Sequence, residues 1–180
     1  KAKTTEHGND FLDVNPVGCV PTLILEGGER VTENIAVLSL LADRHPAFGL
    51  EAHLGRTRLL EMLSLLSTEL HIAFKPFFHS EDEAELAEAS QAVARRLDLI
   101  ADHLRELYLF GPHFTVADAY LFAMLRWAEA LNIPMQPQLK GYFERVAERP
   151  MVRKALTEEG LPIPSGVSVG GPQLQVRATG

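Results

Sequence analysis

The longest run of apolar positions lies late in the chain, at residues 114–131, where the sequence reads FTVADAYLFAMLRWAEAL. Between Val116 and Leu125 its one charged residue is Asp118, and apolar residues occupy every face of the helix that this spacing predicts. Thr115 and Asp118 form the pattern of a capping box at the helix N-terminus. We therefore expect a buried helix that organises the fold, and loss of either cap residue to cost about 0.5–2 kcal/mol.

Helical patterns also flank this segment. One long helix is predicted over residues 52–78, bent ahead of Pro76, and a second from a capping box at residues 80–83 to about Leu109. Pro137 and Pro150 each stand at the favoured first position of a further helix, and Gly160 ends the last one. Residues 161–180 have no periodicity, which is typical of a disordered tail.

The beginning of the chain has a different pattern. Residues 22–25 and 30–31 are predicted to be two short strands, joined by a two-residue turn at Gly27-Gly28. A helix capped by Thr32 or Asn34 follows them. A lone two-stranded hairpin is marginally stable in water. We therefore expect this hairpin to be stabilised by contacts with the helical part or with a segment of the chain before Lys1.

These patterns together predict the fold class α+β. Residues 1–46 form the strand-containing part, residues 47–51 a linker and residues 52–160 an all-helical bundle, with the tail at residues 161–180. No internal repeat is present in the sequence.

Composition narrows the classes of function. With 46% apolar and 23% charged residues, the 180-residue chain has the balance of an ordinary soluble domain, and its net charge of −7 argues against a nucleic-acid partner or an anionic membrane surface. No apolar run approaches the length of a membrane span. The single cysteine, Cys19, fits a reducing compartment, so we expect a cytoplasmic protein. The seven histidines never fall in a metal-ligand spacing, and we infer no metal site.

Three segments together resemble the cytosolic glutathione transferases. Residues 15–43, NPVGCVPTLILEGGERVTENIAVLSLLAD, resemble the second half of their thioredoxin-like domain, and residues 111–128, GPHFTVADAYLFAMLRWA, resemble their buried helix. Residues 67–78, STELHIAFKPFF, are similar to the bacterial beta class. The resemblance implies an incomplete thioredoxin-like domain, whose first strand–helix–strand, with the residue that contacts the glutathione sulfur, would precede Lys1, followed by an all-α domain.

The resemblance also implies where glutathione binds. Val20-Pro21 would be a cis peptide whose Val20 backbone pairs with the cysteinyl part of the ligand, although a plain loop proline is the alternative. Glu33 and Asn34 would hold the γ-glutamyl end at a helix N-terminus, where capping alone is the alternative. Asn34 departs from the family's usual Ser or Gly. Cys19, where the family usually has a polar residue, would line the same cleft as a small apolar side chain or as a redox thiol.

A polar stripe follows the predicted long helix. Its members recur at steps of four, three and four residues: Ser64, Thr68, His71 and Lys75. By itself this is the pattern of a solvent-facing side. The resemblance implies more: Thr68 and Glu69 would reach the glutathione of a dimer partner, and His71 would line the active cleft as a catalytic residue. Ser64 would stand where the beta class has Asn, and Ile72 where it usually has Lys.

The implied function is a transferase subunit that conjugates the glutathione thiolate to an electrophilic apolar compound, with glutathione as co-substrate and a homodimer as the assembly. The electrophile would lie between the Pro21 loop and the helices bearing His71 and Phe74. Two alternatives stay open at this point. One is a glutathione-dependent disulfide reductase or dehalogenase on the same scaffold, and the other is a non-catalytic binding or regulatory protein.

Overall fold

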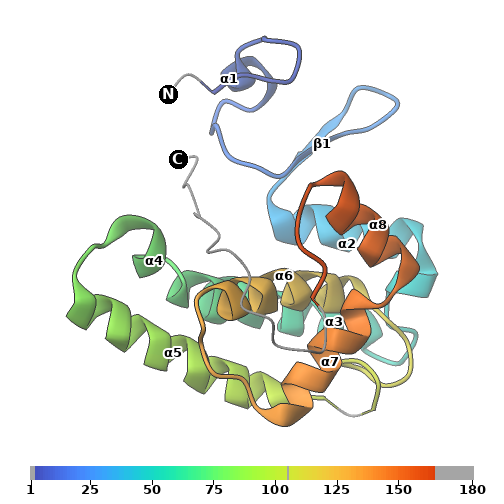
Figure 1. Cartoon of the computed structure of the whole chain (residues 1–180). Coiled ribbons are helices and arrows are strands. Elements are labelled where there is room, and N and C mark those ends of the chain that lie inside the picture. The colour runs from blue at the N-terminus through green and yellow to red at the C-terminus, as the bar shows by residue number, and fades with distance from the viewer. Residues whose placement is uncertain (1–2, 105, 165–180) are drawn as a thin grey trace.

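The computed structural model describes residues 3–104 and 106–164, and begins with a small strand-containing part (Figure 1). Its elements are α1 (Phe11–Val14), β1 (Thr22–Ile24), β2 (Arg30–Thr32) and α2 (Asn34–Arg44). Asp10 caps α1 by accepting the Leu12 amide at 2.9 Å. This part projects from the helical bundle, with α2 as its element nearest to the bundle.

The hairpin of β1 and β2 is antiparallel, with Thr22 opposite Thr32 and Ile24 opposite Arg30. Its predicted two-residue turn is wrong, because the Leu25 amide pairs with the Glu29 carbonyl at 2.9 Å and three residues connect them. Gly28 ends this turn at φ 86°, a left-handed conformation that glycine adopts without strain. Neither strand has a buried residue, and α2 is the helix on which the hairpin mainly packs.

The helical part follows directly. Its elements are the short 3₁₀ helix η1 (Pro46–Phe48), α3 (Gly55–Leu65), the π-helical η2 (Leu66–His71), α4 (Pro76–His79), α5 (Glu83–Ala101), α6 (Val116–Ala130), α7 (Pro137–Ala147) and α8 (Pro150–Glu158). The proline starts of α7 and α8 are confirmed, and Gly160 follows α8 in a left-handed conformation, as a C-terminal glycine should. The η1 turn overlaps the predicted linker, residues 47–51, but begins one residue before it, and the domain boundaries themselves stay predictions.

The predicted single helix over residues 52–78 is wrong. It begins only at Gly55, because Leu54 before it is left-handed, with φ 66°. Gly55 suits this entry since a Cβ there would lie 1.9 Å from the Leu50 carbonyl oxygen. At Leu66 the helix widens into the π-turn of η2, and a separate short helix starts at Pro76.

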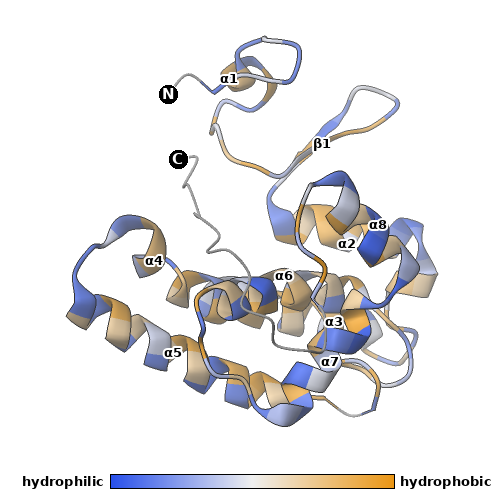
Figure 2. Ribbon diagram, in the orientation of Figure 1, coloured by the Kyte–Doolittle hydropathy of each residue, from blue (hydrophilic) through white to orange (hydrophobic). Residues whose placement is uncertain are grey.

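The next helix is shorter than predicted at both ends. Asp82, not Ser80, caps α5, because its carboxylate accepts the Ala84 amide at 2.9 Å. The helix ends at Ala101 instead of about Leu109. Beyond it the backbone finds other partners: Tyr108 pairs with Gly111, and the Leu109 amide donates to a side chain of α6. In Figure 2 hydrophobic and hydrophilic positions alternate along α5, as expected of a helix with one face on the core.

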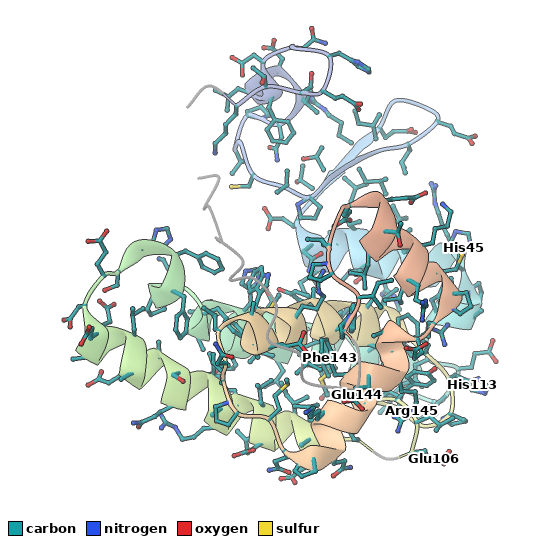
Figure 3. The ribbon with its side chains drawn as sticks, in the orientation of Figure 1. His45, Glu106, His113, Phe143, Glu144 and Arg145 are labelled. Carbon is teal, nitrogen blue, oxygen red and sulfur yellow. The ribbon has the colours of Figure 1, made fainter. Side chains whose placement is uncertain are left out.

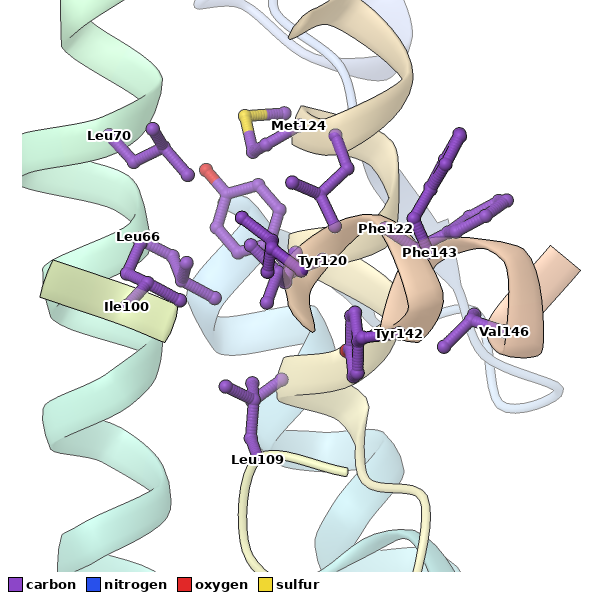
Figure 4. Close-up of a cluster of buried hydrophobic side chains, with 14 of the residues drawn as sticks. Leu66, Leu70, Ile100, Leu109, Tyr120, Phe122, Met124, Tyr142, Phe143 and Val146 are labelled. Atoms are coloured by element: carbon purple, nitrogen blue, oxygen red, sulfur yellow. The ribbon is translucent and has the colours of Figure 1, made fainter. Parts of the chain in front are cut away.

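Helix α6 lies in the middle of the bundle, in contact with α2, α3, η2 and α7 (Figure 1). Most of its residues are buried, and Figure 4 shows Tyr120, Phe122 and Met124 packed among side chains from the neighbouring helices. The prediction of an organising buried helix is confirmed for most of the surface of α6. One side of this helix is exposed, however, at Ala119, Ala123 and Ala130.

The start of α6 is fixed by the buried carboxylate of Asp118. Its Oδ2 accepts the backbone N–H and the hydroxyl of Thr115, both at 2.7 Å, which confirms the capping box. Its Oδ1 accepts the Leu109 amide and the Tyr142 hydroxyl, both at 2.9 Å. Burial and the Asp118 charge raise the pKa of Tyr142 well above its ordinary value, so this phenol stays a donor. One carboxylate thus ties α6 to α7 and to the loop after α5.

Two further contacts hold the outer elements to this core. Arg145 of α7 donates to the Leu107 carbonyl oxygen at 3.0 Å, on the edge of the bundle labelled in Figure 3. After α8, Leu161 and Ile163 pack against the core, so the tail prediction is wrong for residues 161–164; residues 165–180 lie outside the described part. Within the described ranges, we find no helix that is both long and apolar enough to cross a membrane.

The Asp118→Asn variant tests the carboxylate. An amide in its place keeps the volume but turns one acceptor into a donor that faces other donors. We expect the free energy of unfolding in urea to fall by roughly 3 kcal/mol, more than a lost cap alone, since hydrogen bonds to buried charged groups contribute about 1.5–3 kcal/mol each. Asp102→Asn, at the exposed end of α5, is the matched control and should stay within about 0.5 kcal/mol. Equal stability of the two variants would contradict the assignment.

Candidate active site

The loop before β1 has the predicted cis peptide at Val20-Pro21. A buried side chain, Asn15, shapes this loop: its Nδ2 donates to the Cys19 carbonyl oxygen at 2.7 Å and to the Thr22 hydroxyl at 3.2 Å. Asn15 is the first residue of the motif at residues 15–43, but the sequence analysis gave it no role. The sequence does carry a signal for one, because an amide side chain directly precedes the loop, and a buried amide needs hydrogen-bond partners for both its oxygen and its nitrogen.

The outer side of the loop is open. Val20 is 80% exposed, and the Cys19 thiol is exposed and makes only a weak contact, with Sγ 3.7 Å from the Val17 carbonyl oxygen. The Lys3 ammonium group also holds this loop, because it donates a hydrogen bond to the Gly18 carbonyl oxygen at 2.8 Å. The backbone of Val20 is therefore presented on a surface where an extended ligand can pair with it.

The start of α2 is strained. Glu33 precedes it with φ 70° and ψ 125°, a conformation that costs a residue with a Cβ about 1–3 kcal/mol. Glu33 itself is the N-cap, so the prediction of Thr32 or Asn34 in that role is wrong. None of the described side chains accepts a bond from the first turn of this 11-residue helix. Its free amides and its dipole therefore favour an anionic group at this end.

Glu33 and the cis peptide meet at one end of the hairpin. Because Thr22 pairs with Thr32, Pro21 and Glu33 flank the same rung of the ladder. The register of the hairpin thus brings the exposed Val20 backbone close to the uncapped start of α2, although the whole hairpin separates them in the sequence. Within the described part of the chain, the Glu33 carboxylate has neither a hydrogen-bonded nor an ion-paired partner.

The predicted stripe is exposed as a whole, while Leu66, Leu70 and Phe74 on the other side are buried. The Thr68 hydroxyl donates to the Ser64 carbonyl oxygen at 3.0 Å. Glu69 instead faces α5, where its Oε2 lies 3.2 Å from a guanidinium nitrogen of Arg96. The structure therefore keeps Thr68 and Glu69 near the surface but turns them toward different neighbours.

His71 faces α6. Its Nδ1 lies 2.6 Å from the Tyr120 hydroxyl, and its ring meets the Trp127 ring edge-on at a centroid distance of 5.2 Å. Desolvation by these neighbours lowers the pKa of His71 below its ordinary value of 6.5. The imidazole is therefore neutral at neutral pH.

Sequence reasoning missed Tyr120 and Trp127, because it assigned the whole of α6 to folding. Both are aromatic residues with a polar end, seven residues apart and thus on one face of the helix, which is a signal that the sequence does carry. Burial raises the pKa of Tyr120, and the nearby polar side chains of Ser67 and Asn34 partly oppose this effect. Tyr120 therefore bonds His71 directly and lies near Asn34.

A cavity among the described residues lies away from the predicted position of the electrophile. A groove of about 680 Å³ runs between α6, α7 and α8, along the exposed alanines of α6. Neither Pro21 nor His71 lines it, and Phe74 cannot line any open pocket because its side chain is fully buried in the core. Trp127 is the residue shared between the groove and the surroundings of His71. No cluster of three or more metal-binding side chains occurs within residues 3–104 and 106–164.

The chain is similar in sequence and in fold to glutathione S-transferases. Residues 65–150 match the family model "Glutathione S-transferase, C-terminal domain". The chain is 39% identical over 166 residues to glutathione S-transferase GstA of Escherichia coli O157:H7, covering 88% of this chain and 83% of the relative. It is 41% identical, with a TM-score of 0.81, to a sphingomonad glutathione S-transferase complexed with glutathione, covering 89% and 84% of the two chains. The beta-class enzyme of Sphingomonas chungbukensis is 43% identical, with a TM-score of 0.78 and the same coverage. This chain therefore belongs to the glutathione S-transferase family.

Proposed function

We propose that this chain binds glutathione at the Val20 backbone and the start of α2, and conjugates it through its thiolate sulfur to an electrophilic apolar compound. The observation that carries the proposal is Glu33, a strained residue at the open end of an uncapped helix. Strain of this kind persists where the surrounding structure imposes it, and it clusters at ligand-binding positions. The sphingomonad relative complexed with glutathione supports the choice of ligand.

The two groups at this helix start complement the γ-glutamyl end of glutathione. The unpaired Glu33 carboxylate would take the ligand's ammonium group, and the free amides of the first turn of α2 would take its carboxylate. Asn34, the first residue of α2, would add its amide side chain. The exposed Val20 backbone would pair with the cysteinyl residue.

His71 is the proposed catalytic residue, as a donor that stabilises the glutathione thiolate. A neutral imidazole with one N–H suits this role, and its lowered pKa supports it. Cys19 would lie at the edge of the same cleft, without a role in conjugation. The disulfide-reductase and non-catalytic alternatives are not favoured by relatives that are named glutathione S-transferases. A cytoplasmic location and the chemical identity of the electrophile are part of this proposal.

A homodimer would complete the site. Thr68 and Glu69 would reach the glutathione of the partner from the exposed side of α3 and η2. The Glu69–Arg96 ion pair on this side is flanked by two exposed apolar residues, Ile72 at 58% and Leu99 at 60%. Apolar side chains around a half-exposed ion pair are suited to an interface between subunits.

The Glu33→Gln variant tests the ammonium contact. We expect glutathione to bind about 10- to 100-fold more weakly, since a hydrogen bond to a charged group contributes roughly 1.5–3 kcal/mol. Isothermal titration calorimetry of the full chain measures the loss. Glu29→Gln, in the hairpin turn, removes the same charge from the neighbouring strand connection and should bind like the parent chain. Unchanged affinity in Glu33→Gln would remove this residue from the site.

The Leu99→Glu variant tests the dimer. A buried carboxylate without a partner is costly, so we expect analytical ultracentrifugation to show a monomer where the parent chain is dimeric. Met151→Glu is the matched control, because Met151 is 71% exposed but lies on α8, away from α5. A parent chain that sediments as a monomer while it is saturated with glutathione would argue against Thr68 and Glu69 as site residues.

The ionisation of His71 gives a pH prediction. Because its folded-state pKa lies below 6.5, the unfolded chain binds more protons between the two values, and the free energy of unfolding falls as the pH drops through 6.5 toward the folded-state pKa. NMR titration of the His71 ring, assigned with a His71→Gln variant, should give a midpoint below 6.5. In the variant this part of the pH dependence of stability should vanish. A midpoint at or above 6.5 would mean that Tyr120 and Trp127 do not desolvate the ring.

A further inference from the structure

Tyr120 lies where three elements meet. It belongs to α6, His71 and Ser67 belong to η2, and Asn34 begins α2. The Tyr120 ring is buried, and in Figure 4 it packs beside Leu66 and Leu70 of η2. Its hydroxyl lies 2.6 Å from Nδ1 of His71, a short contact between two side chains that are 49 residues apart.

The direction of this hydrogen bond follows from the acid and base strengths of its two groups. The imidazole and the phenol are both neutral at neutral pH, so either one can be the donor. A phenol O–H is a stronger acid than an imidazole N–H, and a neutral imidazole nitrogen is a stronger base than a phenol oxygen. In the short contact between the two groups, the Tyr120 hydroxyl therefore donates its proton to the lone pair of His71 Nδ1.

We propose that Tyr120 is a positioning residue, which donates its hydroxyl proton to Nδ1 and thereby holds His71 in the tautomer with the proton on Nε2. The ring is fixed between the Tyr120 hydroxyl and the Trp127 face. The other ring nitrogen, Nε2, then carries the proton permanently, and it belongs to a residue that is exposed on η2.

This inference rests on the proposed function for its catalytic meaning. A donor, and not a base, is what a glutathione thiolate requires from a neutral histidine. Helix α6, which carries Tyr120, packs against both halves of the site, because it contacts α2, which begins at Asn34, and η2, which carries His71. Tyr120 would thus align the donor with the ligand without touching the ligand itself.

The test is ¹⁵N NMR of the His71 ring in the full chain. In the parent chain, Nδ1 should be unprotonated and hydrogen-bonded, and Nε2 should carry the proton. Tyr120→Phe should shift the Nδ1 resonance toward that of an unbonded ring exchanging between tautomers. Tyr142→Phe is the matched control: it removes another buried phenol hydroxyl, which bonds Asp118 and not His71, so it should lower stability and leave both ring nitrogens unchanged.

Two results would overturn the assignment: a proton on Nδ1 in the parent chain, or an Nδ1 resonance that does not respond to Tyr120→Phe. A second measurement follows the thiolate absorbance of bound glutathione with pH, and its midpoint should rise in Tyr120→Phe relative to the parent chain and to Tyr142→Phe. An unchanged midpoint would contradict the positioning role. If glutathione does not bind at all, the proposed function fails, whereas the nitrogen resonances still decide the tautomer.

Discussion

The arrangement of the helical part depends on one buried carboxylate. Asp118 accepts four hydrogen bonds, from its own cap residue, from the loop after α5 and from α7. A charge without access to water is tolerated only when all its lone pairs are occupied, so these donors have little freedom to move. The axial position and rotation of α6 are set as a result. The positions of the later residues of α6 follow from this placement.

The candidate site uses this placement directly. Tyr120 comes two residues after Asp118 and Trp127 nine, and both meet His71 on η2. The site is energetically unfavourable in itself, because Glu33 is strained by about 1–3 kcal/mol and His71 is partly desolvated. Such unfavourable conformations persist where the surrounding packing holds the residues in them. A rigid α6 provides that packing on the side of the helical bundle.

Local signals in the sequence predicted the elements that local chemistry controls. The capping box of α6 and the proline starts of α7 and α8 depend on neighbours within four residues, and all were correct. The π-turn at Leu66 and the left-handed Leu54 were missed, because they are imposed by tertiary packing. The contact between His71 and Tyr120 joins two segments 49 residues apart, so periodicity cannot reveal it. Family resemblance supplied the residue types of the site, but not their partners.

The two halves of the site are stabilised by different forces. The helical bundle is held by a continuous apolar core, whereas the described residues before α2 include only one buried side chain, that of Asn15. Hydrogen bonds from Asn15, Lys3 and Arg30 keep that part in place, each with a net contribution of only about 0.5–1.5 kcal/mol. Local opening therefore begins there, on the side that presents Val20. A ligand that bridges Val20, Glu33 and His71 stabilises the weaker half through the stronger one, because it binds only when both are folded.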